Sequence, residues 1–315
     1  TTTRNRRRQS RSQRDREEVI RRVSDARPFV PGATLSVRNG KGDVVVETWD
    51  QEEVSFDVEI VARARTEEDA TRLADSVEIE FLNVDGGLRI ESSLPNEEGE
   101  LRGSWATNFR IRTPGKADMD IESCHGVTRI PDIEGDVSVR NAHGATTVGN
   151  TNGALRARQS HGNLDVGLVE ADATIDIRHG HLSMATTEGD LTLKNQHGNA
   201  RLGAVGRKLD LFSAHGNATV EAVGANISGR IRHSELVVSG DVAEAVAVDA
   251  SHGSLRVRRI GGDLEVTVRH GSIAAEQVFK KTNGLLVHIA AQLGELGLDP
   301  RRVDAERAVL SRVGG

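Results

Sequence analysis

Short stretches of alternating apolar and polar residues recur along most of the chain at a constant spacing. Histidine marks the period, because successive histidines lie 18 residues apart from His125 to His233 and, after one inserted residue, from His252 to His288. Ten of the eleven histidines fall on this period, and glycine follows eight of them. The ten are His125, His143, His161, His179, His197, His215, His233, His252, His270 and His288. Such regularity indicates a structural repeat.

Each repeat contains two apolar pairs with a polar residue inside each pair. The third and fifth residues after the histidine are mostly apolar, and so are the twelfth and fourteenth. In one repeat they are Leu164 and Val166, then Ala173 and Ile175. This alternation is typical of short strands with one buried face, and an apolar residue between them, here Val169, suits a corner. Two short strands and glycine-rich turns in 18 residues predict one coil of a parallel β-solenoid.

The predicted fold class is therefore all-β, a single-stranded parallel β-helix with about 18 residues per coil over residues 121–282. Because rungs lie about 4.8 Å apart, nine or so coils would form a rod roughly 40 to 45 Å long. The handedness of parallel crossovers favours right-handed winding.

Two other solenoids with related periods do not fit this pattern. The left-handed hexapeptide helix needs an inward apolar residue every six positions, but polar Asn163, Asn199 and Asn217 occupy one of those positions. A calcium-binding β-roll needs tandem nonapeptides rich in glycine and aspartate, and only scattered Gly-Asp pairs occur.

The flanking regions are less regular. Residues 27–120 are predicted to form an N-terminal β portion that caps the solenoid and contains a helix from Thr66 to Ser76, with Thr66 as its N-cap. Residues 283–315 are predicted to form a C-terminal cap whose helix begins at Asp299-Pro300 and runs to about Arg312. Caps of this kind prevent strands at the ends of the rod from pairing with other molecules. Further strands are expected at residues 35–37, 44–46, 54–62, 77–81, 88–90 and 109–111.

Composition agrees with a thin aliphatic core, since only 3% of residues are aromatic, tyrosine is absent and 33 residues are glycine. The formal net charge of -6 hides a basic N-terminus, because residues 1–23 carry nine arginines against three acids. Residues 1–26 are predicted to be a disordered arm or a juxtamembrane linker. The arm could bind an anionic surface through Arg4, Arg6, Arg7 and Arg8. No aromatic residues are interleaved with these arginines, so nucleic acid is not indicated.

The compartment has to be inferred indirectly. No stretch approaches the roughly 18 apolar residues of a membrane span. The chain begins at Thr1, so a signal or anchor upstream of it is expected.

From about Pro31 to Val278 the chain resembles the bacterial DUF4097 family of β-strand repeat proteins, which carry the label of adhesins. The motifs that carry the resemblance are Gly42-Asp43-Val44-Val45-Val46, the strand Phe109 to Ile111 leading through Pro114 to Asp118-Met119-Asp120-Ile121, and coils such as His125-Gly126 and Gly135-Asp136. The resemblance implies a β-helical protein of the bacterial cell envelope or surface and brings no catalytic residues. The chain departs from the family in its regular histidines, where Asn, Ser or Thr are common, and in the segment after Lys281.

The His-Gly turns are the candidate site, because they should form a ladder of imidazoles along one edge. In one interpretation the histidines are turn residues that tolerate a left-handed conformation beside glycine. In another they bind a divalent transition metal (zinc, nickel or copper), with no other cofactor expected. The candidate ligands are His143, His161, His179, His197 and His215. A linear ladder offers two nitrogens easily but no closed tetrahedron.

A row of imidazoles also predicts a response to pH. Neighbouring rings cannot all be protonated without mutual repulsion, so we expect stability to be lost below about pH 6. His181 lies outside the ladder and is interpreted as an ordinary surface residue.

Catalysis is not indicated. The sequence contains no nucleophile elbow, zinc-protease motif, phosphate loop or dinucleotide fingerprint. Cys124 and His125 are adjacent on a predicted strand and should point to opposite faces. The predicted function is a non-enzymatic envelope or surface β-solenoid that acts in adhesion or as a binding scaffold, with a protein or polysaccharide on its faces. Two alternatives stay open, a metal-binding envelope protein that uses the His-Gly ladder and a self-assembling cytoskeletal-type β-helix.

Overall fold

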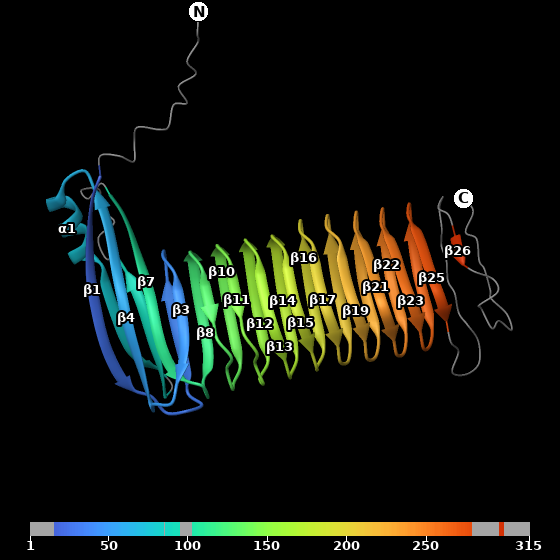
Figure 1. The fold of residues 1–315 in the computed structure, drawn as a ribbon. Helices are drawn as coiled ribbons and strands as arrows, with labels where there is room; N and C mark the ends of the chain where they lie inside the picture. The colour runs from blue at the N-terminus through green and yellow to red at the C-terminus, as the bar shows by residue number, and fades with distance from the viewer. Residues whose placement is uncertain (1–15, 85, 95–102, 279–295, 299–315) are drawn as a thin grey trace, which may run out of the picture.

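The computed structural model describes residues 16–84, 86–94, 103–278 and 296–298, and these form a rod built from two long β-sheets (Figure 1). The first sheet consists, in order, of β1 (Glu17–Pro28), β4 (Glu53–Ala64), β7 (Gly103–Pro114), β3 (Val44–Trp49), β9 (Thr128–Ile130), β11 (Thr146–Val148), β13 (Leu164–Val169), β15 (Leu182–Thr187), β17 (Ala200–Val205), β19 (Ala218–Val223), β21 (Glu235–Val242), β23 (Ser254–Ile260), β25 (Ser272–Val278) and β26 (Leu296–Leu298). The second consists, in order, of β24 (Leu264–Arg269), β22 (Val246–Ser251), β20 (Ile227–Arg232), β18 (Leu209–Ala214), β16 (Leu191–Gln196), β14 (Ala173–His179), β12 (Leu155–His161), β10 (Val137–His143), β8 (Asp118–His125), β2 (Thr34–Asn39), β6 (Gly87–Ser93) and β5 (Glu78–Val84).

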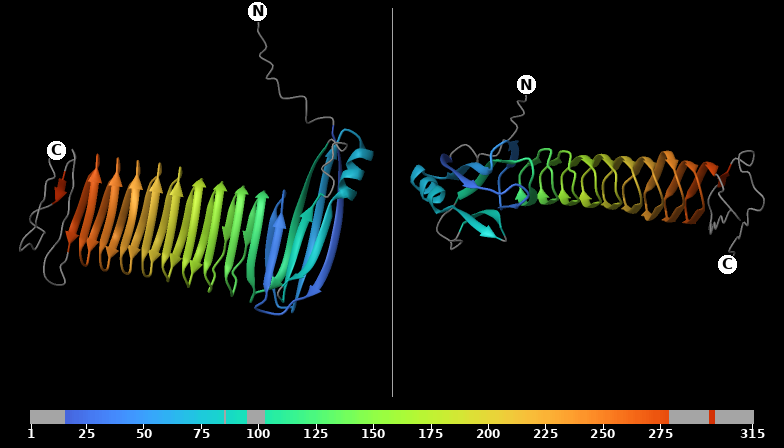
Figure 2. Two further views of the ribbon diagram at one scale, coloured as in Figure 1. Left: turned by 180° about the vertical axis from the view of Figure 1, so that it is seen from behind. Right: turned by 90° about the horizontal axis from the view of Figure 1, so that it is seen from below.

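From β8 to β25 every coil contributes one strand to each sheet. Neighbouring strands are parallel and in register with a spacing of 18 residues, as in the row Val137, Leu155, Ala173 and Leu191. This confirms the predicted β-solenoid, which has about nine turns of roughly 18 residues (Figure 2). The inserted residue is absorbed in β21, where the register against β19 shifts by one. The right-handed winding stays a prediction.

The core lies between the two sheets and is mainly aliphatic in the coils. The positions predicted to face inward are buried, among them Leu164, Ile175 and the corner residue Val169. Aliphatic side chains stack on aliphatic side chains from one coil to the next, and they fit the narrow space between the sheets. The large buried aromatics, Phe56 and Phe109, lie in the N-terminal portion instead.

The chain enters the rod one coil inside its N-terminal end. Strand β2 lies between β6 and β8, and β3 lies between β7 and β9. After β3 the chain moves outward through β4, the helix α1 (Glu67–Ser76), β5, β6 and β7, and it returns to the rod at β8. The predicted helix is confirmed, and the hydroxyl of Thr66 accepts a hydrogen bond of 3.1 Å from the backbone N–H of Asp69. The helix packs against β1 and β4 at this end of the rod (Figure 1).

The prediction that the N-terminal arm is disordered up to residue 26 is wrong for its described part, because residues from Glu17 onward form strand β1. Strand β1 pairs antiparallel with β4 along its whole length. The alternating apolar residues Val19 and Val23 pack against the core. Charged side chains on the outer face pair with β4, as in the 2.8 Å contact of Arg22 with Glu59. The density of arginine concealed this alternation in the sequence. Arg4, Arg6, Arg7 and Arg8 lie outside the described residues.

Most of the predicted C-terminal cap, including the helix expected from Asp299, also lies outside the described residues. The described exception is β26, which pairs in parallel with β25. No helix in the described part of the chain is long and apolar enough to cross a membrane.

Candidate functional site: the histidine edge

Nine histidines form a continuous stack along one edge of the rod. Consecutive ring centroids are 4.7 to 5.0 Å apart, and the planes of consecutive rings differ by at most 23°. All nine side chains are exposed to solvent. The stack consists of His125, His143, His161, His179, His197, His215, His233, His252 and His270. It contains all five predicted metal ligands, and His288 lies outside the described residues.

Eight of the nine turns that carry these rings adopt one of two backbone conformations, and at His179-Gly180 neither residue is left-handed. At Gly126, Gly144 and Gly162 the glycine has a positive φ, between 118° and 137°. From His197 to His270 the histidine itself is left-handed, with φ between 49° and 57°. Both parts of the turn interpretation are therefore observed, in different halves of the rod.

The inter-rung hydrogen bonds change together with the turn. In the first half the glycine N–H donates to the histidine carbonyl of the next coil, as from Gly144 to His161 at 3.0 Å. In the second half the histidine N–H donates instead, as from His215 to the carbonyl of Arg232 at 3.0 Å.

Glycine after the histidine is explained by the approach of consecutive coils. A Cβ at Gly144 would lie 1.9 Å from the carbonyl oxygen of Gly126, and one at Gly216 would lie 1.8 Å from that of Gly198. These distances are far below van der Waals contact, and the opposing atoms belong to the backbone. The close approach therefore favours glycine in both halves, whatever the sign of φ, and Ser234 after His233 is the exception among the described turns.

Beneath many of the turns lies a buried polar side chain two residues before the histidine. The amide nitrogen of Asn141 donates to the carbonyl of Gly126 at 3.1 Å and to Thr146 Oγ1 at 3.1 Å. Asn195 and Ser213 donate to the turn carbonyls of Gly198 and Gly216 at 2.6 and 2.9 Å. Sequence reasoning missed this role, although the repeat alignment places these polar residues in one column.

The geometry of the stack limits what it can do with a metal. Two nitrogens that bind one tetrahedral zinc ion lie about 3.3 Å apart, because each Zn–N bond is about 2.0 to 2.1 Å. Parallel rings at this spacing must tilt before two of them share an ion. In the described part of the chain, no three His, Cys, Asp or Glu side chains are grouped to hold a metal. Metal binding by His143, His161, His179, His197 and His215 stays a prediction that could engage two rings at a time.

The rings influence one another's protonation. The pKa of His161 is lowered, first by desolvation and then by the charges that His143 and His179 would carry. The imidazolium of His161 is therefore disfavoured by its two neighbours in the stack.

His181 has a definite role that sequence reasoning did not find. Two residues after the turn histidine, side chains accept hydrogen bonds from the backbone N–H of the next coil, as Asn163 does from His181 at 3.2 Å. His181 takes the same place, and its Nδ1 accepts from the N–H of Asn199 at 3.3 Å. It is a link between coils rather than an ordinary surface residue.

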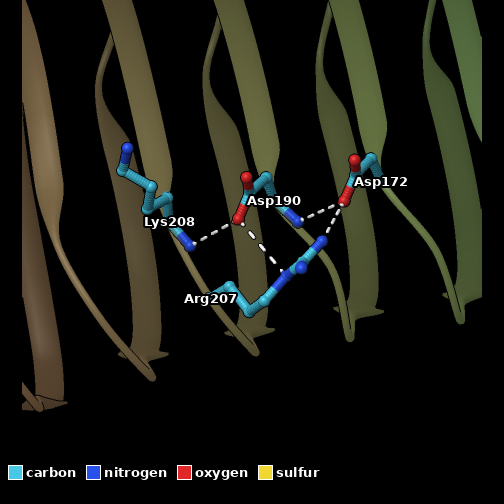
Figure 3. Close-up of polar contacts among 4 residues, drawn as sticks. All are labelled: Asp172, Asp190, Arg207 and Lys208. Atoms are coloured by element: carbon cyan, nitrogen blue, oxygen red, sulfur yellow. Dashed lines mark hydrogen bonds and ion pairs between the residues drawn. The ribbon is translucent and has the colours of Figure 1, made fainter.

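A similar column of acceptors stabilises another turn of the coil. Asp172 accepts from the N–H of Asp190 at 2.8 Å, and Asp190 accepts from the N–H of Lys208 at 3.1 Å (Figure 3). The guanidinium of Arg207 bridges both carboxylates, 2.6 Å from Asp172 and 3.4 Å from Asp190 (Figure 3). The backbone N–H of Asp190 and then Arg207 lower the pKa of Asp172. The column joins coils to one another and leaves no open position for a substrate.

No family model matches the chain, and no curated protein is significantly similar to it. Several solved structures resemble it at low identity. A candidate cell adhesion protein from Clostridium sporogenes is 12% identical over 57% of this chain and 100% of that chain, with a TM-score of 0.33. A candidate adhesin from Parabacteroides distasonis is 13% identical over 84% of this chain and 96% of that chain, with a TM-score of 0.36.

A candidate lipid-binding protein from the same species is 13% identical over 89% of this chain and 96% of that chain, with a TM-score of 0.30. Likenesses this distant carry no argument about what this chain does.

Proposed function

We propose that this protein is a non-enzymatic β-solenoid of the bacterial cell envelope or surface, which acts in adhesion or as a binding scaffold. The observation that carries the proposal is the long, uninterrupted outer face of each sheet. Side chains on these faces lie in register from coil to coil, so chemical groups repeat at the strand spacing of about 4.8 Å. In the first sheet one such outward row runs through Arg129, Thr147, Asp165, Ser183, Arg201 and Thr219.

A row of this kind suits an extended partner better than a small substrate. Charged and hydroxyl groups alternate along it, and each can make one polar contact with a chain that lies along the rod. Many weak contacts add to a useful affinity when they belong to one rigid surface, since the scaffold has little conformational freedom to lose. This supports a protein or polysaccharide as the partner.

The N-terminal end of the outer face is hollowed. A cleft of about 520 Å³ lies across β1, β4, β7, β3 and β9, and its polar lining includes Asp57, Asn108, Arg110 and Arg129. In the part of the chain that the structure describes, Arg110 and Arg129 make no ion pair and flank Val45 in register. The cleft offers donors for carboxylate or hydroxyl groups at one end of the extended face.

The capped N-terminal end favours this proposal over a self-assembling β-helix. There the parallel coils give way to antiparallel strands, and the outermost strand of the first sheet, β1, carries charges of both signs. Charged edge strands oppose pairing with a second molecule. A metal-binding envelope role would rest on the histidine stack alone, which offers two rings per ion only after tilting.

The experiment combines location with binding. Protease treatment of intact cells of the source bacterium should degrade the protein, and the purified rod should bind components of a glycan and matrix-protein array. An Arg110→Glu, Arg129→Glu variant should bind at least fivefold less, whereas Arg140→Glu, Arg156→Glu on the second sheet serves as the charge-matched control. A protein that remains in the cytoplasmic fraction after the envelope is removed, or filaments in electron micrographs of the purified rod, would overturn the proposal.

A further inference from the structure

Several arginines lie beside the histidine stack near its C-terminal end. Arg232, Ser251 and Arg269 lie in register on β20, β22 and β24. Each immediately precedes a stacked histidine, His233, His252 or His270. The same position in the six earlier coils holds Arg178 and five uncharged residues, namely Cys124, Ala142, Ser160, Gln196 and Ala214.

These side chains surround a shallow depression of about 310 Å³. Its lining consists of Arg230, Arg232, His233, Asp249, Ser251, His252 and Arg269. Three arginines therefore face one carboxylate, and Asp249 lies 3.8 Å from Arg230. In the described part of the chain Arg232 and Arg269 have no ion-pair partner, so the depression is cationic even with neutral imidazoles.

We propose that this depression binds a phosphate group. The guanidinium of arginine is a planar fork of N–H donors that matches the oxygens of phosphate, and it stays charged at every physiological pH. Arg232 and Arg269 approach the depression from two sides, two rungs apart. The hydroxyl of Ser251 lies between them in the register and adds a second kind of donor.

The histidines make the proposed site sensitive to pH. Ser251 Oγ lies 3.3 Å from His252 Nδ1, which leaves the other ring nitrogen free to face a ligand. His252 stacks on His233 and His270 with centroid distances of 4.8 Å in both directions. The charged or titratable groups around His252 are Arg230, Arg232, Asp249 and Arg269 before the turn, His233 and His270 in the stack, and Glu235 after the turn, where it pairs with Arg256 at 3.3 Å.

Most of these neighbours are cationic, and a bound anion places negative charge beside the imidazole of His252. That negative charge favours the imidazolium. By linkage, a ligand that favours the protonated histidine binds more tightly where that histidine is protonated. Affinity for an anion of constant charge should therefore rise as the pH falls through the histidine range.

This site lies apart from the cleft at the N-terminal end, and its proposal does not depend on an adhesive role. The test is isothermal titration of the whole chain with inorganic phosphate at pH 6.0 and pH 7.5, at constant ionic strength, with sulfate as a parallel probe because its charge is the same at both pH values. We expect phosphate to bind at both pH values and sulfate to bind at least threefold tighter at the lower pH. An Arg232→Gln, Arg269→Gln variant should lose at least tenfold in affinity.

The matched control is Arg140→Gln, Arg156→Gln, which removes the same charge from the same sheet at two exposed arginines without ion-pair partners among the described residues. It should change the affinity less than twofold, and thermal melts of both variants check folding. Equal losses in the two variants would mean general electrostatic attraction and would overturn the site. So would the absence of phosphate binding at both pH values.

Two further arms identify where such a phosphate comes from. Vesicles of phosphatidylglycerol, compared with phosphatidylcholine, test a lipid headgroup, and short-chain polyphosphate tests a soluble polymer. Sensitivity of either interaction to the Arg232→Gln, Arg269→Gln variant supports the site and names its source. If both probes bind the variant as well as the parent protein, the proposed site is wrong for ligands larger than the free ion.

Discussion

The turns in the two halves of the rod carry the same His-Gly pair and reach the same stack by different routes. In the first half glycine takes the positive φ, as at Gly144, whereas in the second half histidine does, as at His215. The ring spacing does not change between them, remaining at 4.7 to 5.0 Å. The feature common to both halves is the close approach of the glycine to the carbonyl of the preceding coil. The repeat is therefore constrained by packing between coils, and the backbone conformation of each turn is secondary.

The strongest way to break this comparison is to add a methyl group at the glycine in each half. Gly144→Ala and Gly216→Ala should each lower the free energy of unfolding by about 3 kcal/mol, because the added Cβ meets a backbone carbonyl that no side-chain rotation can move. Chemical denaturation measures the change. Gly115→Ala is the control, since a Cβ there has no neighbour within 4 Å, and its effect should stay within about 0.5 kcal/mol. A neutral Gly216→Ala would show that φ, rather than contact, selects glycine.

A smaller effect separates the two turn conformations directly. Histidine is several-fold enriched among residues with positive φ, whereas a β-branched residue such as valine is a genuine outlier there, a difference of about 1 kcal/mol. His215→Val, at φ 56°, should therefore destabilise the protein by about that amount more than His143→Val, where the left-handed residue is the following glycine. Both variants remove one ring from the stack, so the difference between them isolates the backbone. Equal losses would mean that the two halves do not differ in solution.

The inward rows were predictable because burial imposes a period of two on the strands, and Leu164 and Ile175 stand where the repeat places them. The stack followed from the same period, since an offset repeated every coil must fall on one line. The change of turn conformation between His161 and His197 was not predictable, because the His-Gly sequence is identical on both sides of it. Strand β1 was missed because Arg21 and Arg22 interrupt an alternation that only pairing with β4 makes visible.

The site divides in the same way. The histidines could be named from sequence because they repeat, and the buried Asn141 could have been named from its place in the alignment of coils. The depression at Arg232 and Arg269 could not be predicted from the sequence. Its two arginines do not recur in every coil, and they come close together through the register of β20, β22 and β24. Features that repeat in every coil could be predicted from the 18-residue period, whereas features that do not repeat could be found only in the three-dimensional structure.

Titration sharpens the comparison further by asking whether the two halves act as one stack. The folded protein lowers the pKa of His161 below its unfolded value. The unfolded chain therefore binds more protons between the two values, so the stabilisation is present above about pH 6.5 and is lost as the pH falls. We expect a lower melting temperature at pH 5 than at pH 7.5, and His161→Asn should reduce this dependence. An unchanged melting temperature would show that the rings are not coupled.

The smallest effect concerns the acceptor column at the other turn, where the same backbone bond occurs with and without an arginine. Asp136 accepts from the N–H of Ala154 at 2.8 Å, as Asp172 does from Asp190, but only Asp172 also pairs with Arg207. An asparagine keeps the acceptor oxygen, so Asp136→Asn should be nearly neutral. Asp172→Asn should cost somewhat more but less than about 1 kcal/mol, since the ion pair is exposed.

The pH dependence of that small cost is the decisive observation. The pKa of Asp172 is lowered by its two donors, so its contribution is present above the ordinary aspartate pKa and is lost as the pH falls below it. Denaturation at pH 7 and pH 3 should show the cost of Asp172→Asn shrinking at the lower pH. A cost that persists at pH 3 would mean that Asp172 stabilises the coil through packing rather than through its charge.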